Sequence, residues 1–376
     1  MSADLPIPAT AARYMARALE LARRGEGRTA PNPPVGAVLV RDGRIVGEGF
    51  HPAAGEPHAE IFALRAAGEL SRGADLYVTL EPCCHRGRTG PCTEALIAAG
   101  VRRVFYGVVD PNPCVAGEGL ARLRAAGVEV APAPLTAQCA RLIAPFAKHV
   151  TCGRPFVILK AAMTLDAQLA TSAGESRWIS GAASRELVHR LRDRVDGILT
   201  GAGTVVADDP RLTTRLPEGG RNPARIVLDG RLRTLPQAQI YSAAASGRRL
   251  LVTAADAAAQ QLAPYRNAGV EVVAAPRRGE HLDLATVMDQ LGALGLQTLL
   301  VEAGGGLNGA LLRAGLVDRL MLFVAPLLFG GSDGRPLFAG AGAACLAEAL
   351  HLAELHVSRV GDDLLLEGEI VRCSPA

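Results

Sequence analysis

The feature that most limits the fold of this chain is an alternation of short apolar segments with amphipathic segments, which occurs twice along the sequence. Apolar runs such as ADLYVTL (74–80) and VRRVFYGVV (101–109) have the length of buried strands, and a segment with helical spacing follows each of them. Strands that alternate with helices predict layered α/β domains. Because 376 residues are too many for one ordinary core, we expect two such domains.

The first part of the chain predicts one sheet covered by helices. Helices are expected at about 11–24, 59–70, 92–100 and 116–127. Strands are expected within 35–50 and at 74–80, 101–109 and 127–134. The pair Asp42-Gly43 separates two alternating segments, which predicts a hairpin turn.

The composition changes near residue 150, where Gly153 and Pro155 precede a new apolar run. We therefore divide the chain into domains 1–150 and 151–376. In the second domain, strands are expected at 156–161, 196–201, 224–229, 248–254, 297–303 and 318–329 and within 357–371. Helices are expected at 182–194, 284–295 and 307–316. This alternation also predicts an α/β domain.

Charge and composition exclude several classes of protein. The net charge is only +3, aromatic residues make up 4% of the chain, and no basic block occurs, so we expect no nucleic-acid partner. No apolar run is long enough for a membrane span, and the N-terminal segment lacks the apolar stretch of a signal peptide. The eight irregularly spaced cysteines then indicate reduced thiols and metal ligands in a cytoplasmic protein.

Residues 80–92, LEPCCHRGRTGPC, combine with an upstream His-Ala-Glu to suggest a catalytic metal site. A catalytic zinc ion has three protein ligands and an open fourth position, which His58, Cys83 and Cys92 would provide. Glu60 need not bind the metal and would carry a proton between water and a leaving amine. These are the parts of a zinc deaminase, with one zinc ion per chain.

The main alternative to a catalytic site is a structural zinc clip. Such a clip normally uses four protein ligands and has no need of Glu60, so we favour catalysis. Cys84 competes as a ligand by position, but the Pro82-Cys83 pair favours Cys83. The loop between the cysteines is longer than in the short form of the motif. Its residues His85, Arg88 and Thr89 would hold an anionic group such as a phosphate.

The second domain has two glycine-rich turns that suggest a dinucleotide site. Residues 304–309, GGGLNG, follow an expected strand and begin a helix, so their backbone can approach a pyrophosphate. A second turn, GAGTVVADD, follows the strand that ends at Thr200. No acidic residue lies at the usual distance after the first turn, which argues against a Rossmann domain.

Seven segments together resemble a known family and span nearly the whole chain. They are NPPVGAVLV (32–40), GEGFHPAAGEPHAE (47–60), TLEPCCHRGRTGPCTEALI (79–97), LKAAMTLDAQLA (159–170), SRWIS (176–180), HRLRDRVDGILTGAGTVVADDPRLTTR (189–215) and VEAGGGLNGALLRAGLVD (301–318). The chain resembles the bifunctional deaminase–reductases of riboflavin biosynthesis. This resemblance implies a cytidine-deaminase-like three-layer α/β/α domain followed by a dihydrofolate-reductase-like α/β domain.

The resemblance also implies two consecutive reactions on one phosphorylated pyrimidine. The first domain would deaminate 2,5-diamino-6-ribosylamino-4(3H)-pyrimidinone 5′-phosphate, and the second would use NADPH to reduce the ribosyl group to a ribityl chain. Pocket positions of the deaminase family correspond here to Asn32, His51, His85, Arg88 and Thr89.

For the reductase, the resemblance implies two sets of residues. Cofactor positions correspond to Ala162, Trp178, Thr204, Asp208, Gly304, Gly305, Gly306, Leu307, Asn308, Gly309 and Ala310. Substrate positions correspond to Ser176, Arg192, Leu212, Arg215 and Glu302. We add Lys160 to the substrate set, because a lysine within an apolar strand needs a partner or a ligand, and Asp166 is one candidate partner.

Two departures from the family concern the cofactor side, namely Ala167 and Ala303, where glycine is common. Three alternatives remain open at this point. One is a nucleic-acid deaminase of the tRNA type with an accessory nucleotide-binding domain, and another is a zinc-stabilised nucleotide sensor. The third is a deaminase that has lost its reductase activity. We also expect the chain to form a homo-oligomer.

Overall fold

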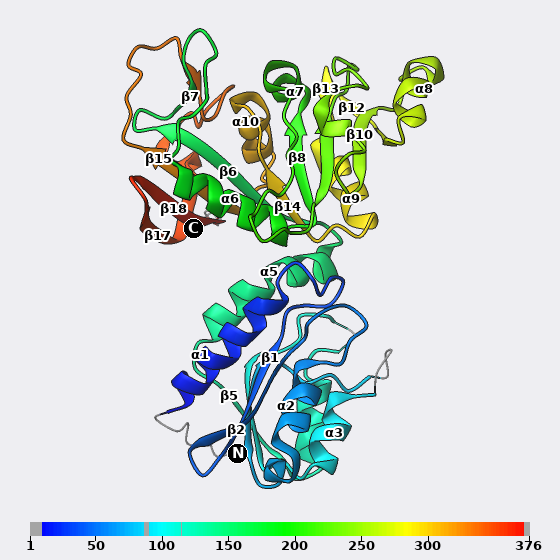
Figure 1. Ribbon diagram of the computed structural model, residues 1–376, viewed down its shortest axis with the longest axis vertical. Helices are drawn as coiled ribbons and strands as arrows, with labels where there is room; N and C mark the ends of the chain where they lie inside the picture. The colour runs from blue at the N-terminus through cyan, green and yellow to red at the C-terminus, as the bar shows by residue number, and fades with distance from the viewer. Residues whose placement is uncertain (1–9, 86–89, 114, 372–376) are drawn as a thin grey trace. The chain divides into compact units, whose positions relative to one another are not determined.

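The computed structural model describes residues 10–85, 90–113 and 115–371. Its contacts divide the chain into two compact units, Met1–Gly153 and Arg154–Ala376 (Figure 1). Each unit is an α/β assembly built on its own sheet, as the alternation predicts. None of the helices in the described ranges combines the length and the apolar character needed to cross a membrane.

The sheet of the N-terminal unit has five strands in the order β2-β1-β3-β4-β5. These are β1 (Gly36–Arg41), β2 (Arg44–Phe50), β3 (Asp75–Leu80), β4 (Arg103–Val108) and β5 (Glu129–Pro132). Strands β3 to β5 are parallel, whereas β1 is antiparallel to both β2 and β3. The turn between β1 and β2 has φ of 52° at Asp42 and 74° at Gly43, which confirms the predicted hairpin.

Helices cover both faces of this sheet. Helices α1 (Ala11–Ala22) and α5 (Thr136–Cys152) contribute to one apolar layer, and α2 (Ala59–Ala67), α3 (Cys92–Ala98) and α4 (Glu118–Ala125) pack on the other face. Short 3₁₀ turns at Arg23–Gly25 and Gly68–Ser71 follow α1 and α2. A Cβ atom at Gly36 would lie 2.0 Å from the carbonyl oxygen of Ala18, so only glycine lets α1 approach β1 this closely.

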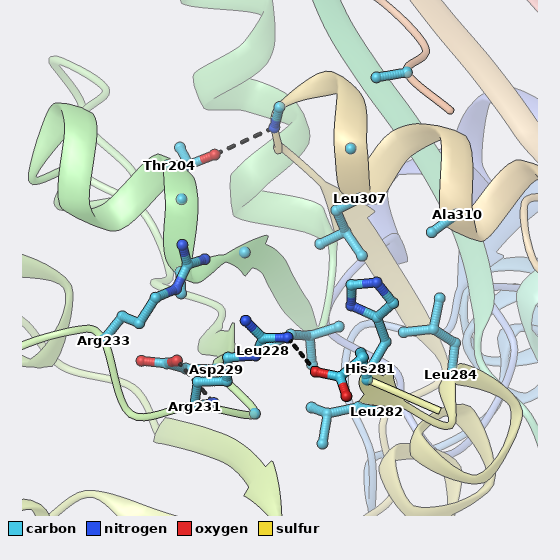
Figure 2. A pocket seen from close by; sticks show the side chains of 18 of the residues that line it. Thr204, Leu228, Asp229, Arg231, Arg233, His281, Leu282, Leu284, Leu307 and Ala310 are labelled. Carbon is cyan, nitrogen blue, oxygen red and sulfur yellow. Dashed lines mark hydrogen bonds and ion pairs between the residues drawn. The ribbon is translucent and has the colours of Figure 1, made fainter. Parts of the chain in front are cut away.

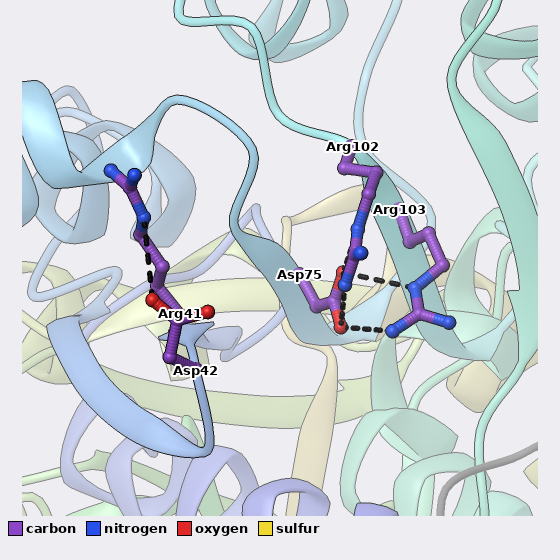
Figure 3. Close-up of polar contacts among 5 residues, drawn as sticks. All are labelled: Arg41, Asp42, Asp75, Arg102 and Arg103. Carbon is purple, nitrogen blue, oxygen red and sulfur yellow. Dashed lines mark hydrogen bonds and ion pairs between the residues drawn. The ribbon is translucent and has the colours of Figure 1, made fainter.

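The starts of β3 and β4 are joined by a carboxylate between two guanidinium groups (Figure 3). Asp75 Oδ1 accepts hydrogen bonds from Arg102 Nη2 at 3.0 Å and from Arg103 Nε at 2.9 Å. Asp75 is buried, and a buried carboxylate needs partners of this kind. Figure 3 also shows the weaker contact of Arg41 with Asp42 in the hairpin turn, at 3.8 Å. The Asp75 cluster therefore fixes the end of the sheet opposite the metal-ligand motif.

The C-terminal unit contains a nine-stranded sheet in the order β11-β10-β9-β8-β14-β6-β15-β18-β17. The strands are β6 (Phe156–Thr164), β8 (Gly197–Gly201), β9 (Ala224–Leu228), β10 (Arg249–Ala254), β11 (Glu271–Ala275), β14 (Thr298–Val301), β15 (Arg319–Ala325), β17 (His351–Val360) and β18 (Asp363–Val371). The strands from β11 to β15 are parallel, and β18 and β17 extend the sheet in antiparallel pairs.

Five α-helices surround this sheet in the described ranges: α6 (Ala182–Arg194), α7 (Ala202–Asp208), α8 (Ala259–Asn267), α9 (Leu284–Ala293) and α10 (Gly305–Arg313). Two short pairs, β7 (Gln168–Ala170) with β16 (Arg335–Pro336) and β12 (Arg277–Arg278) with β13 (His281–Leu282), and 3₁₀ turns at Gln239–Tyr241 and Leu346–Glu348 complete the unit. Helices α7 and α10 follow the adjacent parallel strands β8 and β14, so both begin at the same edge of the sheet.

The structure adds elements that the sequence pattern did not indicate. Helices α5 and α8 were not expected, and each has a proline inside it, Pro145 and Pro264. Proline is a strong helix-breaking signal, so both segments resemble loops in sequence. The second glycine-rich turn also differs from the expectation, because residues 202–208 form α7.

Candidate active sites in the two domains

Three side chains from separate segments of the N-terminal unit meet at one point. His58 precedes α2, Cys83 follows β3 and Cys92 begins α3, and their ligand atoms all lie within 4.8 Å of one another. His58 Nδ1 lies 3.5 Å from Cys83 Sγ and 3.4 Å from Cys92 Sγ. Tetrahedral zinc with bonds of about 2.3 Å to sulfur and 2.0 Å to nitrogen separates such ligands by about 3.5 Å. The three side chains therefore fit a zinc ion.

Glu60 lies beside this cluster in the first turn of α2. Its side chain is only 3% exposed, and its Oε2 has no hydrogen-bond partner among the described residues. Burial, together with the charge of Cys83, raises the pKa of Glu60 to about 7. A buried carboxylate with a free oxygen and a pKa near neutrality is suited to accept and release a proton.

The surroundings shift the pKa values of the two cysteines of the cluster in opposite directions. Hydrogen bonding with Cys92 and His58 lowers the pKa of Cys83, whereas the contact with Cys83 and burial raise that of Cys92. Cys84 is not part of the group of ligand atoms. Its Sγ lies instead 3.8 Å from Glu118 Oε2. The described cysteines are all free thiols, so the cluster is not a disulfide.

A cavity of about 370 Å³ opens onto Glu60. Among the residues that line it are Asn32, His51, His58, Cys83 and His85. His51 Nδ1 donates to the carbonyl oxygen of Pro57 at 3.0 Å, so its Nε2 accepts from Asn32 Nδ2 at 3.1 Å. Burial lowers the pKa of His51, which favours this neutral form. The structure thus brings Asn32, His51 and His85 to one cavity, whereas Arg88 and Thr89 lie outside the described residues.

The same cavity is lined by residues that the sequence analysis missed, including Glu81, Asp110, Asn112 and Phe146. Buried Glu81 accepts hydrogen bonds from the backbone N–H groups of residues 110, 117, 119 and 120. This carboxylate therefore fixes the loop that carries Asp110 and Asn112. The available signal was the segment DPNP, which directly follows an expected strand of a parallel sheet.

The reductase-side residues meet in a second cavity, of about 700 Å³, in the C-terminal unit. It is lined by Lys160, Ala162, Ser176, Trp178, Arg192, Thr204, Asp208, Leu212, Arg215, Glu302 and Gly304. These residues come from β6, the loop before α6, α6 itself, α7, the loop after α7 and the segment that follows β14. All six substrate-side positions of the sequence analysis are thus in one cavity, together with five of the cofactor positions.

An ion cluster at this cavity centres on Glu302. Arg192 Nε and Nη2 donate to the two carboxylate oxygens of Glu302 at 2.7 and 2.9 Å. Burial alone would raise the pKa of Glu302, but the charge and hydrogen bonds of Arg192 and the charge of Lys160 lower it to about 2. Burial lowers the pKa of Lys160, and Glu302 opposes this shift.

The partner suggested for Lys160 was wrong. Asp166 instead accepts hydrogen bonds from Thr164 Oγ1 and from the backbone N–H of Gly330, in the turn after β6. Lys160 faces Glu302, and its Nζ lies 5.6 Å from the centre of the Phe323 ring. Lys160 lies in the middle of β6, whereas Asp166 lies beyond the end of this strand.

His189 and Arg185 are further cavity residues that the sequence analysis missed. Burial and the charges of Arg192 and Arg215 lower the pKa of His189 to about 4, so it is neutral at pH 7. Arg185 lies over the ring of Trp178, 4.7 Å from its centre. Trp178 is 67% exposed, so it is not a residue of the apolar core.

The glycine-rich turns lie at the junction of two cavities. Gly304 N donates to Thr204 Oγ1 at 3.2 Å, and both residues line the 700 Å³ cavity and a neighbouring one of about 600 Å³. Gly306, Leu307 and Ala310 line the latter.

The remaining residues of the first glycine turn face the protein. Cβ atoms at Gly305 and Gly309 would lie 2.3 and 2.2 Å from the carbonyl oxygens of Pro336 and Ala339. Asn308 is fully buried and donates to the carbonyl oxygens of Ala303 and Leu337. These three residues therefore hold the loop 336–339 against α10, and they line neither cavity.

Comparison with protein families matches both units. Residues 8–108 match the cytidine and deoxycytidylate deaminase zinc-binding region, and residues 155–366 match the RibD C-terminal domain. The chain is 44% identical to riboflavin biosynthesis protein RibD of Escherichia coli (strain K12), over 94% of this chain and 97% of that protein. It is 40% identical to the RibD protein of Actinobacillus pleuropneumoniae, over 95% of each.

Solved structures agree with these sequence matches. Acinetobacter baumannii RibD superposes with a TM-score of 0.83 at 38% identity, covering 96% of this chain and 99% of that one. A diaminohydroxyphosphoribosylaminopyrimidine deaminase/5-amino-6-(5-phosphoribosylamino)uracil reductase from Thermotoga maritima gives 0.81 at 35% identity, with the same coverage. These similarities confirm the fold class, with zinc and NADPH as the cofactors of the two domains. The chain belongs to the RibD family, the bifunctional deaminase–reductases of riboflavin biosynthesis.

Proposed function

We propose that the N-terminal unit deaminates 2,5-diamino-6-ribosylamino-4(3H)-pyrimidinone 5′-phosphate. The observation that carries this proposal is the placement of Glu60, whose unpartnered Oε2 lies at a cavity beside His58, Cys83 and Cys92. His58, Cys83 and Cys92 would hold one zinc ion per chain. Zinc bound there would act as the Lewis acid that lowers the pKa of water.

Glu60 would then carry the proton. Its carboxylate accepts a proton from the attacking water and releases it to the amino group that leaves the pyrimidine as ammonia, so that an oxo group replaces the amine. The Asn32 amide, held by His51, would orient the pyrimidine ring, and His85, Arg88 and Thr89 would bind the phosphate. Asp110 and Asn112 lie on the same cavity and would contact the ribosyl part of the substrate.

We propose that the C-terminal unit reduces the deaminated product to 5-amino-6-(5-phosphoribitylamino)uracil. NADPH bound there would supply the hydride for C1′ of the sugar, which is thereby opened to a ribityl chain. The cofactor would contact Ala162, Trp178, Thr204 and Asp208, and the members of the turn at 304–310 that line the cavities, namely Gly304, Gly306, Leu307 and Ala310. Support comes from the meeting of two cavities at Thr204 and Gly304, where a long cofactor can lie across both.

The remaining residues of this cavity would bind and orient the sugar phosphate. Ser176, Leu212 and Arg215 form one group, and Lys160, Arg192 and Glu302 form the other. Of these, Lys160 is the group able to move a proton while the ring opens, because burial lowers its pKa, whereas the pKa of Glu302 is lowered to about 2. Arg192 holds Glu302 in its ionised form.

Two further properties remain our proposals. We propose that the chain is a cytoplasmic protein, as its free thiols suggest. We also propose that it is a homo-oligomer in which a second copy covers β17. This edge strand exposes Leu352, Leu355 and Val357, and it pairs only with β18 among the described strands. Light scattering after size exclusion should show a multiple of the 39.1 kDa chain that Val357→Glu dissociates; a monomer would contradict this.

A direct test of the two reactions uses zinc-loaded protein and the phosphorylated diaminopyrimidinone. Mass spectrometry should detect the deaminated uracil without NADPH and its ribityl derivative once NADPH is added. Deamination without subsequent reduction would overturn the reductase half of the proposal. The absence of any turnover of this substrate would overturn the deaminase half, and pre-deaminated substrate with NADPH would then test the reductase half separately.

A further inference from the structure

The 600 Å³ cavity beside the glycine turns leads away from the substrate residues, and this inference rests on the proposed use of a nicotinamide dinucleotide. The sheet order β6-β14-β8-β9 places the ends of four parallel strands in a row. Ala162 belongs to β6, Gly304 and Thr204 follow β14 and β8, and Asp229 follows β9. Adjacent strands are about 4.8 Å apart, so this row spans about 14 Å. A dinucleotide with its nicotinamide near Ala162 would thus place its adenosine half beyond β8, over the end of β9.

The walls of the cavity fit that adenosine half (Figure 2). The side chains of Leu228, Leu282, Leu284, Leu307 and Ala310 provide apolar surface. Polar groups come from the turn after β9, namely Asp229, Arg231 and Arg233, and from the β12–β13 pair, namely Glu280 and His281. An apolar wall with a small number of polar groups is the usual form of a ligand pocket.

Asp229 occupies the position at which an NAD site would place a carboxylate for the ribose hydroxyls. Here the carboxylate is 2% exposed and is used internally. Its Oδ2 accepts from Thr234 N at 2.7 Å and from Thr234 Oγ1 at 2.9 Å, and Oδ1 faces Arg231 N at 3.4 Å. Asp229 therefore shapes the turn and leaves no oxygen for a ribose.

The turn that Asp229 shapes presents two arginines to the cavity. Arg231 Nη2 is paired with Glu280 Oε2 at 2.7 Å. Arg233 is exposed and has no ion pair or hydrogen bond within the described part of the chain. In Figure 2 its side chain extends from the turn toward Thr204. An unpaired guanidinium on the cavity wall beside the end of β9 is suited to a phosphate monoester.

We propose that Arg233 binds the 2′-phosphate of the cofactor and makes the reductase selective for NADPH over NADH. Asp229 acts as a positioning residue that fixes the turn, and Arg231, already neutralised by Glu280, contributes less. The oxygens of Asp229 are directed into the turn, where they accept hydrogen bonds from Arg231 N, Thr234 N and Thr234 Oγ1.

The test is calorimetric titration of the full-length protein with NADPH and NADH, comparing wild type with Arg233→Gln and Arg233→Lys. The matched control is Arg266→Gln, since Arg266 is an exposed arginine on α8 outside the cavity. We expect Arg233→Gln to weaken NADPH binding about ten- to a hundred-fold, as for the loss of a hydrogen bond to a charged group, and to leave NADH binding within about twofold. Arg233→Lys should recover part of the loss.

Adenosine 2′,5′-bisphosphate and AMP serve as fragment probes in the same titrations. Only the bisphosphate should lose affinity in Arg233→Gln. Equal losses for NADPH and NADH would place Arg233 at the diphosphate, and unchanged binding of NADPH would remove it from the site; either result overturns this inference. A wild-type protein that binds neither dinucleotide would instead overturn the proposed cofactor.

Discussion

Glu60 and Glu302 are both buried carboxylates, yet their surroundings shift their pKa values in opposite directions. Glu60 has an oxygen without a partner and a pKa raised by burial to about 7. Glu302 is also buried, but the bidentate contact with Arg192 brings its pKa down to about 2. One group is therefore suited to exchange a proton near neutral pH, and the other to remain a fixed negative charge.

Replacement of Glu60 tests its assignment as the proton carrier. We expect Glu60→Gln to lower the deamination rate by about 10²- to 10⁴-fold, the usual effect of losing a general acid–base group. Zinc content and the reduction of pre-deaminated substrate should not change. Glu56→Gln is the matched control, because Glu56 lines the same cavity and is exposed. Deamination at the wild-type rate in Glu60→Gln would contradict the assignment.

The Arg192–Glu302 pair predicts a pH-dependent contribution to stability. Because the pKa of Glu302 is depressed, its contribution is complete above the ordinary glutamate value of about 4.3 and is lost as the pH falls toward 2. We expect Glu302→Gln to lower the free energy of unfolding by about 3 kcal/mol at pH 7, since it leaves a buried guanidinium unpaired.

The difference in the free energy of unfolding between wild type and Glu302→Gln should shrink in urea titrations carried out at successively lower pH below about 4.3. Glu218→Gln provides a control, because Glu218 forms an exposed ion pair with Arg190. This substitution should lower the free energy of unfolding far less than Glu302→Gln does. A stability difference that is constant down to the lowest pH would show that Glu302 is not held ionised by Arg192.

At the scale of elements, the turn between β6 and β7 contains a residue in an unfavourable conformation. Ala167 has φ of 60°, in the left-handed region, and it is exposed. Its backbone N–H bonds to the carbonyl oxygen of Thr164, and its carbonyl accepts from Leu337 N, so the turn is fixed from both sides. The structure thus gives a physical reason for the glycine that is common at this position.

We therefore expect Ala167→Gly to stabilise the protein by about 1 kcal/mol, because it removes a Cβ from the left-handed conformation. Ala263→Gly, at an exposed site inside α8, should be destabilising by a similar amount. Thermal unfolding of both variants and the wild type checks this: the melting temperature should rise for Ala167→Gly and fall for Ala263→Gly. A lower melting temperature for Ala167→Gly would contradict the strain at this turn.

The sequence predicted elements well where local chemistry decides the conformation and poorly where distant contacts decide it. The Asp42-Gly43 hairpin follows from turn chemistry, and the association of His58, Cys83 and Cys92 follows from a motif whose segments flank one strand. Helix α5 was missed because Pro145 contradicts its local pattern and its packing against the sheet overrides it. The Arg192–Glu302 pair joins residues 110 positions apart, which no single-sequence pattern indicates.

The pocket residues likewise include some that the sequence predicts and others that depend on contacts between distant residues. Asn32 and His51 were found through family motifs, but the loop of Asp110 and Asn112 depends on the buried carboxylate of Glu81, which only the structure reveals. The glycines of the turn at 304–309 were treated as one group in the sequence. The structure separates Gly304 and Gly306, which border cavities, from Gly305 and Gly309, which contact the loop at 336–339.

At the scale of the whole molecule, the residues proposed for the two reactions belong to separate compact units. The described metal-ligand cluster is in the N-terminal unit, and the glycine turns are in the C-terminal unit. Each site is completed by residues of its own unit. The two reactions should therefore fail independently when one site is damaged.

Removal of zinc tests this independence. Dialysis against a chelator should abolish deamination and leave the NADPH-dependent reduction of pre-deaminated substrate within about twofold of its original rate, and added zinc should restore deamination. Loss of reduction on chelation, with recovery on zinc addition, would show that the C-terminal site depends on the metal.

The most direct measurement of the central claim mixes two variants, each with one damaged site. Glu60→Gln and Glu302→Gln are incubated separately and together with the diaminopyrimidinone substrate and NADPH, and the products are followed by mass spectrometry. The account predicts unreacted substrate with Glu60→Gln, deaminated uracil with Glu302→Gln, and the ribityl product only in the mixture. A mixture that yields no ribityl product, with both variants folded, would contradict two separate sites that act in sequence on one free intermediate.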